Sequence, residues 1–155
     1  NKGEVIILAL PRGGVPVAYE VAKTLNLPLD VFIVRKIGAP FHEELAIGAI
    51  ALGGVTFINR NLVQNLGVGE QIIQEIIYKE TSELERRNKI YRQEKPFPSL
   101  VNKTVILIDD GLATGSTILV AIAALKKLNP AKIIVAVPIG SSTVCGYLKE
   151  QADEV

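Results

Sequence analysis

Residues 105–117 read Val-Ile-Leu-Ile-Asp-Asp-Gly-Leu-Ala-Thr-Gly-Ser-Thr, and this stretch decides the fold. An apolar run ends in two carboxylates, Asp109 and Asp110, and a turn of small and hydroxyl-bearing residues follows them. Such a turn can present backbone N–H groups, hydroxyls and a helix N-terminus to one point, which is how proteins hold a phosphate. It is not a Walker A loop, because its glycine spacing is one residue short and it lacks the lysine.

Three more apolar runs have the same character. They are nearly continuous rather than alternating, which is typical of parallel strands covered on both faces. The four predicted core strands are Val5–Leu10, Leu29–Val34, Thr104–Ile108 and Lys132–Val137. Helical patterns lie after the first and third of them, so the predicted fold class is α/β, an open, mostly parallel twisted sheet flanked by helices.

The middle of the chain predicts an insertion into that pattern. Ala46–Leu52 and Val55–Ile58 flank Gly53-Gly54, which indicates a β-hairpin with a glycine turn. A long charged helix follows, from about Gly69 to Arg92. Its arginines at 86, 87 and 92 have the spacing to reach a ligand or a partner subunit, but the favoured interpretation is a solvated helix with i,i+4 ion pairs.

Composition narrows the class of protein. The 155 residues carry 17 basic and 16 acidic side chains, a net charge of +1, which argues against a nucleic-acid or membrane-surface partner. A hydrophobic content of 48% excludes intrinsic disorder, and one cysteine excludes a disulfide scaffold. No apolar run approaches the roughly 20 residues of a membrane span. We expect a soluble cytoplasmic domain over residues 1–155, taken from a longer protein and lacking N- and C-terminal segments.

The acidic pair indicates what lies beside the phosphate. Two carboxylates would repel a polyphosphate, but they suit sugar hydroxyls or a magnesium ion shared with the ligand. A phosphate with a vicinal diol a few ångströms away describes a ribose 5-phosphate. Positive charge that develops on such a ribose at its anomeric carbon would be stabilised by Asp109 and Asp110.

The stretch closely resembles the motif with which type I phosphoribosyltransferases bind 5-phosphoribosyl 1-pyrophosphate (PRPP). The similarity extends to Leu10–Gly14, where that family has its pyrophosphate loop, and to Val34–Lys36, before its flexible catalytic loop. It covers nearly all of the chain from Val5 onward and is greatest to a bacterial group of stand-alone phosphoribosyltransferase domains. It also predicts a cis peptide bond between Pro11 and Arg12.

The resemblance implies a role for each matching residue. Catalysis would rest on Asp109, Asp110, Arg35 and Lys36, the two aspartates holding Mg²⁺ through ligand hydroxyls or water. The ribose 5-phosphate would be bound by Asp109, Asp110, Gly111, Leu112, Ala113, Thr114, Gly115, Ser116 and Thr117. The pyrophosphate would be bound by Arg12, Gly13, Gly14, Arg35 and Lys36. The acceptor base would lie near Ile139 and Gly140.

Two departures from the family pattern bear on the activity. Hypoxanthine–guanine enzymes place an acid at the position of Ala113, although adenine, orotate and uracil enzymes also lack it. The expected flexible loop, Ile37–Leu45, contains His42 and two glutamates but no lysine or arginine.

The implied function is a Mg²⁺-dependent phosphoribosyltransferase that uses PRPP and a nucleobase or related acceptor, expected as a homodimer. The alternative is a PRPP- or nucleotide-binding regulatory domain without turnover. A DNA-uptake accessory protein with the same motif is a weaker third possibility, since no cysteine-rich zinc region is present. The sequence does not identify the acceptor.

Overall fold

The four predicted core strands form one parallel sheet. The computed structural model describes residues 4–155, and its four-stranded sheet has the order β2-β1-β6-β7, with every neighbouring pair parallel. The strands are β1 (Val5–Ala9), β2 (Leu29–Val31), β6 (Thr104–Ile108) and β7 (Lys132–Ala136). The predicted α/β class is therefore confirmed.

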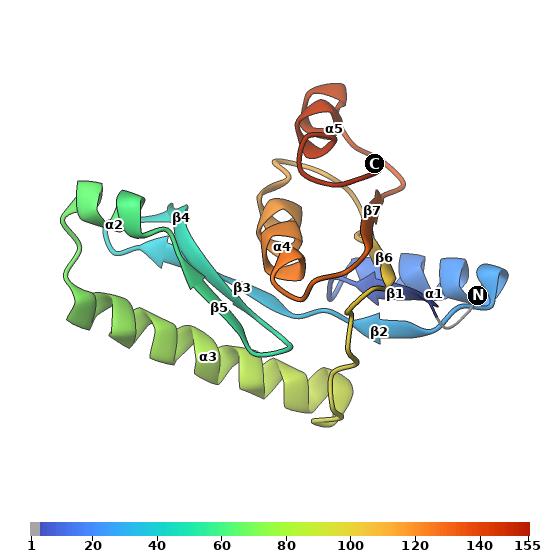
Figure 1. Cartoon of the computed structure of the whole chain (residues 1–155), viewed down its shortest axis with the longest axis horizontal. Helices are drawn as coiled ribbons and strands as arrows, with labels where there is room; N and C mark the ends of the chain where they lie inside the picture. The colour runs from blue at the N-terminus through green and yellow to red at the C-terminus, as the bar shows by residue number, and fades with distance from the viewer. Residues whose placement is uncertain (1–3) are drawn as a thin grey trace.

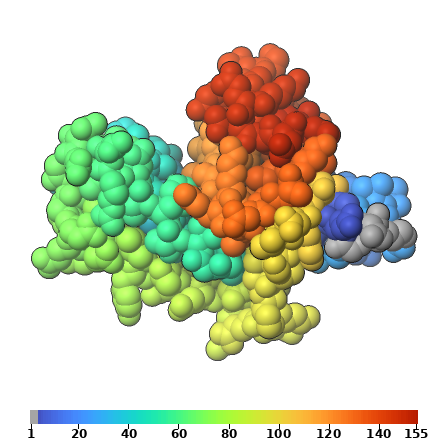
Figure 2. Space-filling view, viewed as in Figure 1, coloured from blue at the N-terminus to red at the C-terminus, as the bar shows by residue number. Residues whose placement is uncertain are grey.

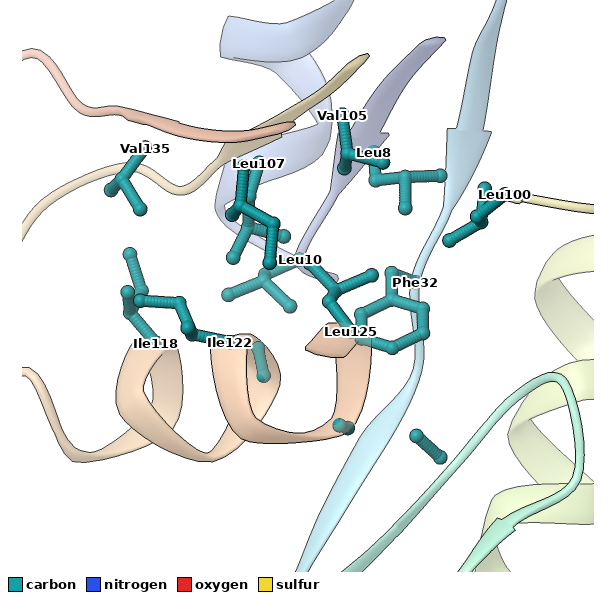
Figure 3. Packing of buried hydrophobic residues seen from close by; sticks show 14 of the residues in the cluster. Leu8, Leu10, Phe32, Leu100, Val105, Leu107, Ile118, Ile122, Leu125 and Val135 are labelled. Atoms are coloured by element: carbon teal, nitrogen blue, oxygen red, sulfur yellow. The ribbon is translucent and has the colours of Figure 1, made fainter. Parts of the chain in front are cut away.

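Helices cover both faces of this sheet, which explains why its strands are continuously apolar. Leu8 and Leu107 face a core beneath α4 (Ser116–Lys126), whereas Ile7 and Ile108 face a second core beneath α1 (Gly14–Leu25). Successive side chains of a strand point to opposite faces, so both sets must be apolar when both faces are covered. Figure 3 shows α4 packed on the first of these faces.

The insertion forms a second, antiparallel sheet with its own helices. Its strand order is β3-β4-β5, and it packs against α2 and α3 in a separate hydrophobic cluster. The elements are β3 (Val34–Ala39), β4 (His42–Ala51), β5 (Val55–Ile58), α2 (Arg60–Leu66) and α3 (Glu70–Arg92). The predicted glycine hairpin and long helix are thus confirmed, and this part projects to one side of the parallel sheet as a distinct lobe (Figures 1 and 2).

The segment Ile37–Leu45 has the form of two strands and a turn, where the sequence analysis expected a loop. It contains the end of β3, a tight turn at 40–41 and the start of β4. Ile37 and Ala39 are buried against the α2–α3 cluster, so burial holds the strand in place well beyond Lys36. The predicted strand Leu29–Val34 is divided, because β2 ends at Val31 in the parallel sheet and β3 begins at Val34 in the antiparallel sheet.

The end of α3 is anchored by a buried arginine, not by a solvated one. Arg92 is 6% exposed and donates to both carboxylate oxygens of Asp30 at 2.7 and 2.8 Å. It also donates to Asn88 and to the carbonyls of Lys95 and Pro96. These bonds join the insertion to the parallel sheet next to β2.

The structure also contains two short helices that the sequence analysis did not predict. A short helix, α5 (Ser142–Leu148), follows β7, and α2 precedes α3; neither was predicted. Among the helices of residues 4–155, none has the length and apolar character that a bilayer-spanning helix requires.

Candidate active site

The predicted site residues gather at the carboxyl edge of the parallel sheet. Ala9 of β1 pairs with Ile108 of β6, so the segments that follow these two strands leave the sheet side by side. The Leu10 amide extends this pairing by donating to the Ile108 carbonyl at 2.9 Å. Ligands of open α/β sheets bind at this edge, where the strand ends converge.

The predicted pyrophosphate loop lies directly against the acidic pair. A Cβ on Gly13 would come within 2.0 Å of Asp110 Oδ2, and one on Gly14 within 2.6 Å of the Ile108 carbonyl oxygen. A side chain at residue 13 would displace the Asp110 carboxylate, and one at residue 14 would collide with backbone that cannot move aside. The peptide bond between Pro11 and Arg12 is cis, as predicted, and the Arg12 side chain is exposed.

The turn before α4 has the form of an anion cradle. Gly115 adopts a left-handed conformation (φ 74°) at the helix N-cap and has no side chain with which to cap the first turn, and the Ser116 amide donates a long hydrogen bond to Thr114 Oγ1 at 3.4 Å. The Thr114 hydroxyl donates to Ser116 Oγ at 3.1 Å, and both side chains are exposed together with Thr117. Uncapped N–H groups and hydroxyls at a helix N-terminus favour a phosphate.

The two carboxylates differ in their surroundings. Asp109 is half-buried and accepts a hydrogen bond from the Asp110 backbone amide at 2.8 Å, whereas Asp110 is exposed. Burial, together with the neighbouring carboxylate of Asp110, raises the pKa of Asp109 above its ordinary value, although the amide bond opposes this. A ligand that brings hydroxyls or a cation to Asp109 would relieve this unfavourable ionisation.

A cavity of about 290 Å³ opens beside the cradle. It lies between the end of β1, the start of β3 and the first turns of α4, and its charged lining residues are all cations. It is lined by Leu10, Pro11, Phe32, Ile33, Val34, Arg35, Lys36, Arg87, Ser116, Thr117 and Val120. The structure therefore brings Arg35 and Lys36 to the same cavity as the phosphate cradle.

Both predicted strand cations are already paired with carboxylates. Arg35 donates to Glu80 of α3 at 2.7–2.8 Å, and the Glu80 side chain is only 14% exposed. Lys36 lies 3.1 Å from Glu44 of β4, whose side chain is 86% exposed. The first pair ties the strand to α3, while the second is a solvated contact that a ligand can displace more readily.

The predicted base-binding residues also adjoin the acidic motif. The Leu112 amide donates to the Ile139 carbonyl at 3.0 Å, and a bridge pairs Leu112 with Gly140. An open surface depression beside them is lined from Asp110 to Ala113 and from Ile139 to Ser141. The Ile139 side chain is 74% exposed, so it is available to a planar ligand.

The two aspartates fit a cation that takes most of its ligands from elsewhere. Within residues 4–155, no three His, Cys, Asp or Glu side chains cluster closely enough to hold a metal ion by themselves. Mg²⁺ characteristically keeps several waters and is bound through one or two carboxylates and substrate phosphates. The donor set at Asp109 and Asp110 suits that manner of binding.

Sequence reasoning considered a ligand contact from Arg87 but favoured a solvated helix, and it did not include Glu80 in the site. Glu80 and Arg87 lie 25 and 18 residues before Val105, the first residue of the motif, and a charged helix carries no signal of which side chains face a cavity. One i,i+4 ion pair of the kind expected for this helix joins Glu83 and Arg87 at 2.8 Å. That pairing does not prevent Arg87 from lining the cavity.

A family model for the phosphoribosyl transferase domain matches residues 38–154. The chain belongs to this family. It is 40% identical over 151 residues to the proteins named "Putative phosphoribosyl transferase Rv0571c" and "Putative phosphoribosyl transferase MT0597" from two strains of Mycobacterium tuberculosis. The match covers 97% of this chain and 34% of each relative. The chain thus spans about a third of the length of these curated relatives, in contrast to the stand-alone domains that the sequence resembles.

Two solved structures have a similar fold. The crystal structure of TT1426 from Thermus thermophilus superposes with a TM-score of 0.85 at 35% identity, covering 98% of this chain and 72% of that one. The AQ2163 protein from Aquifex aeolicus superposes with a TM-score of 0.54 at 15% identity, covering 99% of this chain and 53% of that one. The second likeness concerns the fold alone.

Proposed function

We propose that this domain binds PRPP and transfers its 5-phosphoribosyl group to a nitrogenous base with release of pyrophosphate, or catalyses the reverse reaction. The observation that carries the proposal is the contact between Gly13 and the Asp110 carboxylate, which joins the pyrophosphate loop to the acidic end of the phosphate cradle. Membership of the phosphoribosyl transferase domain family supports the same conclusion.

The site residues suit distinct parts of PRPP. The first turn of α4, with Thr114, Ser116 and Thr117, would hold the 5-phosphate. Asp109 and Asp110 would face the ribose hydroxyls, and the loop from Arg12 to Gly14 would receive the pyrophosphate. Arg35 and Lys36 line the cavity beside the cradle and would add positive charge there.

The reaction needs charge stabilisation more than proton transfer. The bond between the anomeric carbon and the pyrophosphate oxygen breaks, its electron pair leaves with pyrophosphate, and a bond to the acceptor nitrogen forms. Where that nitrogen carries a proton, the proton passes to the pyrophosphate or to solvent. Carboxylates fixed at Asp109 and Asp110 would stabilise the positive charge that develops on the ribose. Mg²⁺, held by these aspartates through ligand hydroxyls or water, would neutralise charge on the departing pyrophosphate.

The acceptor would lie against Ile139 and Gly140, which adjoin Asp110 across the same surface depression. We further propose that the protein acts in the cytoplasm as a homodimer and that its 1–155 segment is one domain of a longer chain. The acceptor is taken as a nucleobase or a related nitrogen heterocycle.

A regulatory PRPP-binding domain without turnover is the second candidate. Two observations favour it: Arg35 and Lys36 are each paired with a glutamate, and Ile37–Leu45 is a hairpin segment without lysine or arginine. A site of this kind retains affinity while lacking mobile cations that would close over the leaving group.

Calorimetric titration with PRPP and Mg²⁺ tests the common part of both candidates. The unaltered protein is expected to bind, and the double variant Asp109→Asn, Asp110→Asn is expected to lose binding while remaining folded. Absence of binding by the unaltered protein would overturn both. Pyrophosphate release with a panel of purines, pyrimidines and pyridines then separates them, because only the transferase releases pyrophosphate in response to an acceptor.

A further inference from the structure

Two adjacent arginines of α3 share one carboxylate but face different surroundings. Arg86 donates to both oxygens of Glu83 at 2.8 and 2.9 Å, and Arg87 donates to Oε1 of Glu83 through Nε at 2.8 Å. The Arg86 side chain is 60% exposed, whereas that of Arg87 is 33% exposed. Of the two, only Arg87 lines the 290 Å³ cavity beside the phosphate cradle.

Arg87 retains hydrogen-bonding capacity that the protein does not use. Its bond to Glu83 employs Nε alone, and within residues 4–155 neither Nη1 nor Nη2 donates a hydrogen bond to a protein group. Lys36, by contrast, meets Glu44, and Arg35 is committed to Glu80 through two of its nitrogens. Arg87 is therefore the cavity cation with two unengaged terminal nitrogens.

Glu83 holds the Arg87 side chain through Nε and leaves its two terminal nitrogens available to a ligand. The two arginines hold the pKa of Glu83 at about 2, so its carboxylate stays charged and keeps Arg87 tethered across the neutral range. A guanidinium held at Nε presents its remaining N–H groups as a fork, which matches two oxygens of one phosphate. Across the cavity, Ser116 and Thr117 belong to the predicted phosphate cradle.

We propose that Arg87 is a direct binding residue for a phosphate group of the ligand, so that α3 of the insertion completes the site formed by the parallel sheet. This inference rests on the proposed function, because it takes the cavity as part of the PRPP site. It gives α3 a direct role in ligand recognition, in place of the solvated helix that the sequence favoured.

The test is a calorimetric titration of the full chain with PRPP and Mg²⁺, comparing Arg87→Gln, Arg87→Lys and the matched control Arg86→Gln. Loss of one charge-assisted contact predicts about 10- to 100-fold weaker binding for Arg87→Gln. Arg87→Lys keeps the positive charge but not the forked pair of nitrogens, so its affinity for PRPP is expected to fall several-fold. Arg86→Gln removes the other partner of Glu83 and is expected to bind within about twofold of the unaltered protein.

Each outcome bears on a different statement. If the unaltered protein binds PRPP and Arg87→Gln binds equally well, the inference is wrong while the proposed function stands. Equal losses in Arg86→Gln and Arg87→Gln would also overturn it, because they would place the effect in the Glu83 pairing. If the unaltered protein does not bind PRPP, both proposals fail. Melting curves of the three variants establish that each is folded, and Arg87→Lys keeps the test decisive should Arg87→Gln unfold.

Discussion

Gly13 and Asp110 are in such close contact that no side chain fits between them: a Cβ at residue 13 would lie 2.0 Å from Asp110 Oδ2 and 2.5 Å from its Cγ. The residue-13 backbone itself is unstrained, with φ −60° and ψ −36°. Gly13→Ala is therefore expected to fold but to push the Asp110 carboxylate away from the loop. We predict at least tenfold weaker PRPP binding, measured by calorimetry, with little change in melting temperature.

Gly146→Ala is the matched control for this substitution. Gly146 lies in α5, and a Cβ there would meet no atom within 4 Å. Alanine favours a helix over glycine by about 0.5–1 kcal/mol, so the control is expected to be equally or more stable and to bind PRPP normally. Normal PRPP binding by Gly13→Ala would show that the position of Asp110 does not matter for the ligand.

Gly14→Ala, unlike Gly13→Ala, is expected to lower the stability of the fold. Its Cβ would lie 2.6 Å from the Ile108 carbonyl oxygen and 2.9 Å from the Asp109 Cα, both of which are backbone atoms of the central strand and its exit. Backbone cannot give way as a side chain does, so we predict destabilisation of about 2–3 kcal/mol. Urea unfolding monitored by circular dichroism measures this, and a stability equal to that of Gly13→Ala would contradict it.

Asp109→Asn is predicted to stabilise the ligand-free protein while abolishing PRPP binding. Asparagine Oδ1 can still accept the 2.8 Å bond from the Asp110 amide, but the buried charge and its repulsion from Asp110 are removed. Sites that bind ligands commonly sacrifice stability in this way. We expect the melting temperature to rise by about 1–3 °C at pH 7. A fall in melting temperature would mean that the charge of Asp109 stabilises the fold.

The pH dependence of this effect follows from the sign of the shift. Because the folded-state pKa of Asp109 is raised, its favourable contribution is complete below the ordinary value of 3.8 and is lost as pH rises through the folded value. Asparagine does not titrate. The advantage of Asp109→Asn in melting temperature should therefore be constant near neutral pH and disappear as pH falls toward 3.8. An advantage that grew in acid would contradict the assigned direction.

The sequence predicted the parallel sheet and the acidic motif because their signals are local. Continuous apolar runs identify strands buried on both faces, and the turn after Ile108 carries its chemistry within nine residues. The contribution of the insertion could not be predicted in this way. Whether Arg87 lines a cavity and Arg92 is buried depends on how α3 crosses β2 and β3, and this long-range packing leaves no periodic signature. The expected loop conformation of residues 37–45 was wrong because Ile37 and Ala39 extend β3 and pack on the insertion's own core.

Glu80 and Glu44 are predicted to act on ligand binding in opposite directions. Glu80 is 14% exposed and holds Arg35 at the cavity, so Glu80→Gln should cost about 1–3 kcal/mol of stability and weaken PRPP binding.

Glu44 is exposed and competes with the ligand for Lys36. Glu44→Gln should leave stability within about 0.5 kcal/mol and tighten PRPP binding up to a few-fold. Paired melting and calorimetric measurements check both, and weaker binding by Glu44→Gln would mean that the pair positions Lys36 instead.

Arg92→Met is predicted to be among the most destabilising changes in α3, although it lies outside the cavity. Removal of the guanidinium leaves the Asp30 carboxylate and the carbonyls of Lys95 and Pro96 without their donors. Breaking one side of a buried ion pair costs about 3–5 kcal/mol. The control Arg86→Met alters an exposed pair and should cost under about 1 kcal/mol in urea unfolding. Equal losses in the two variants would mean that Asp30 is rehydrated when Arg92 is removed, and that the bonds between α3 and β2 contribute little to the free energy of unfolding.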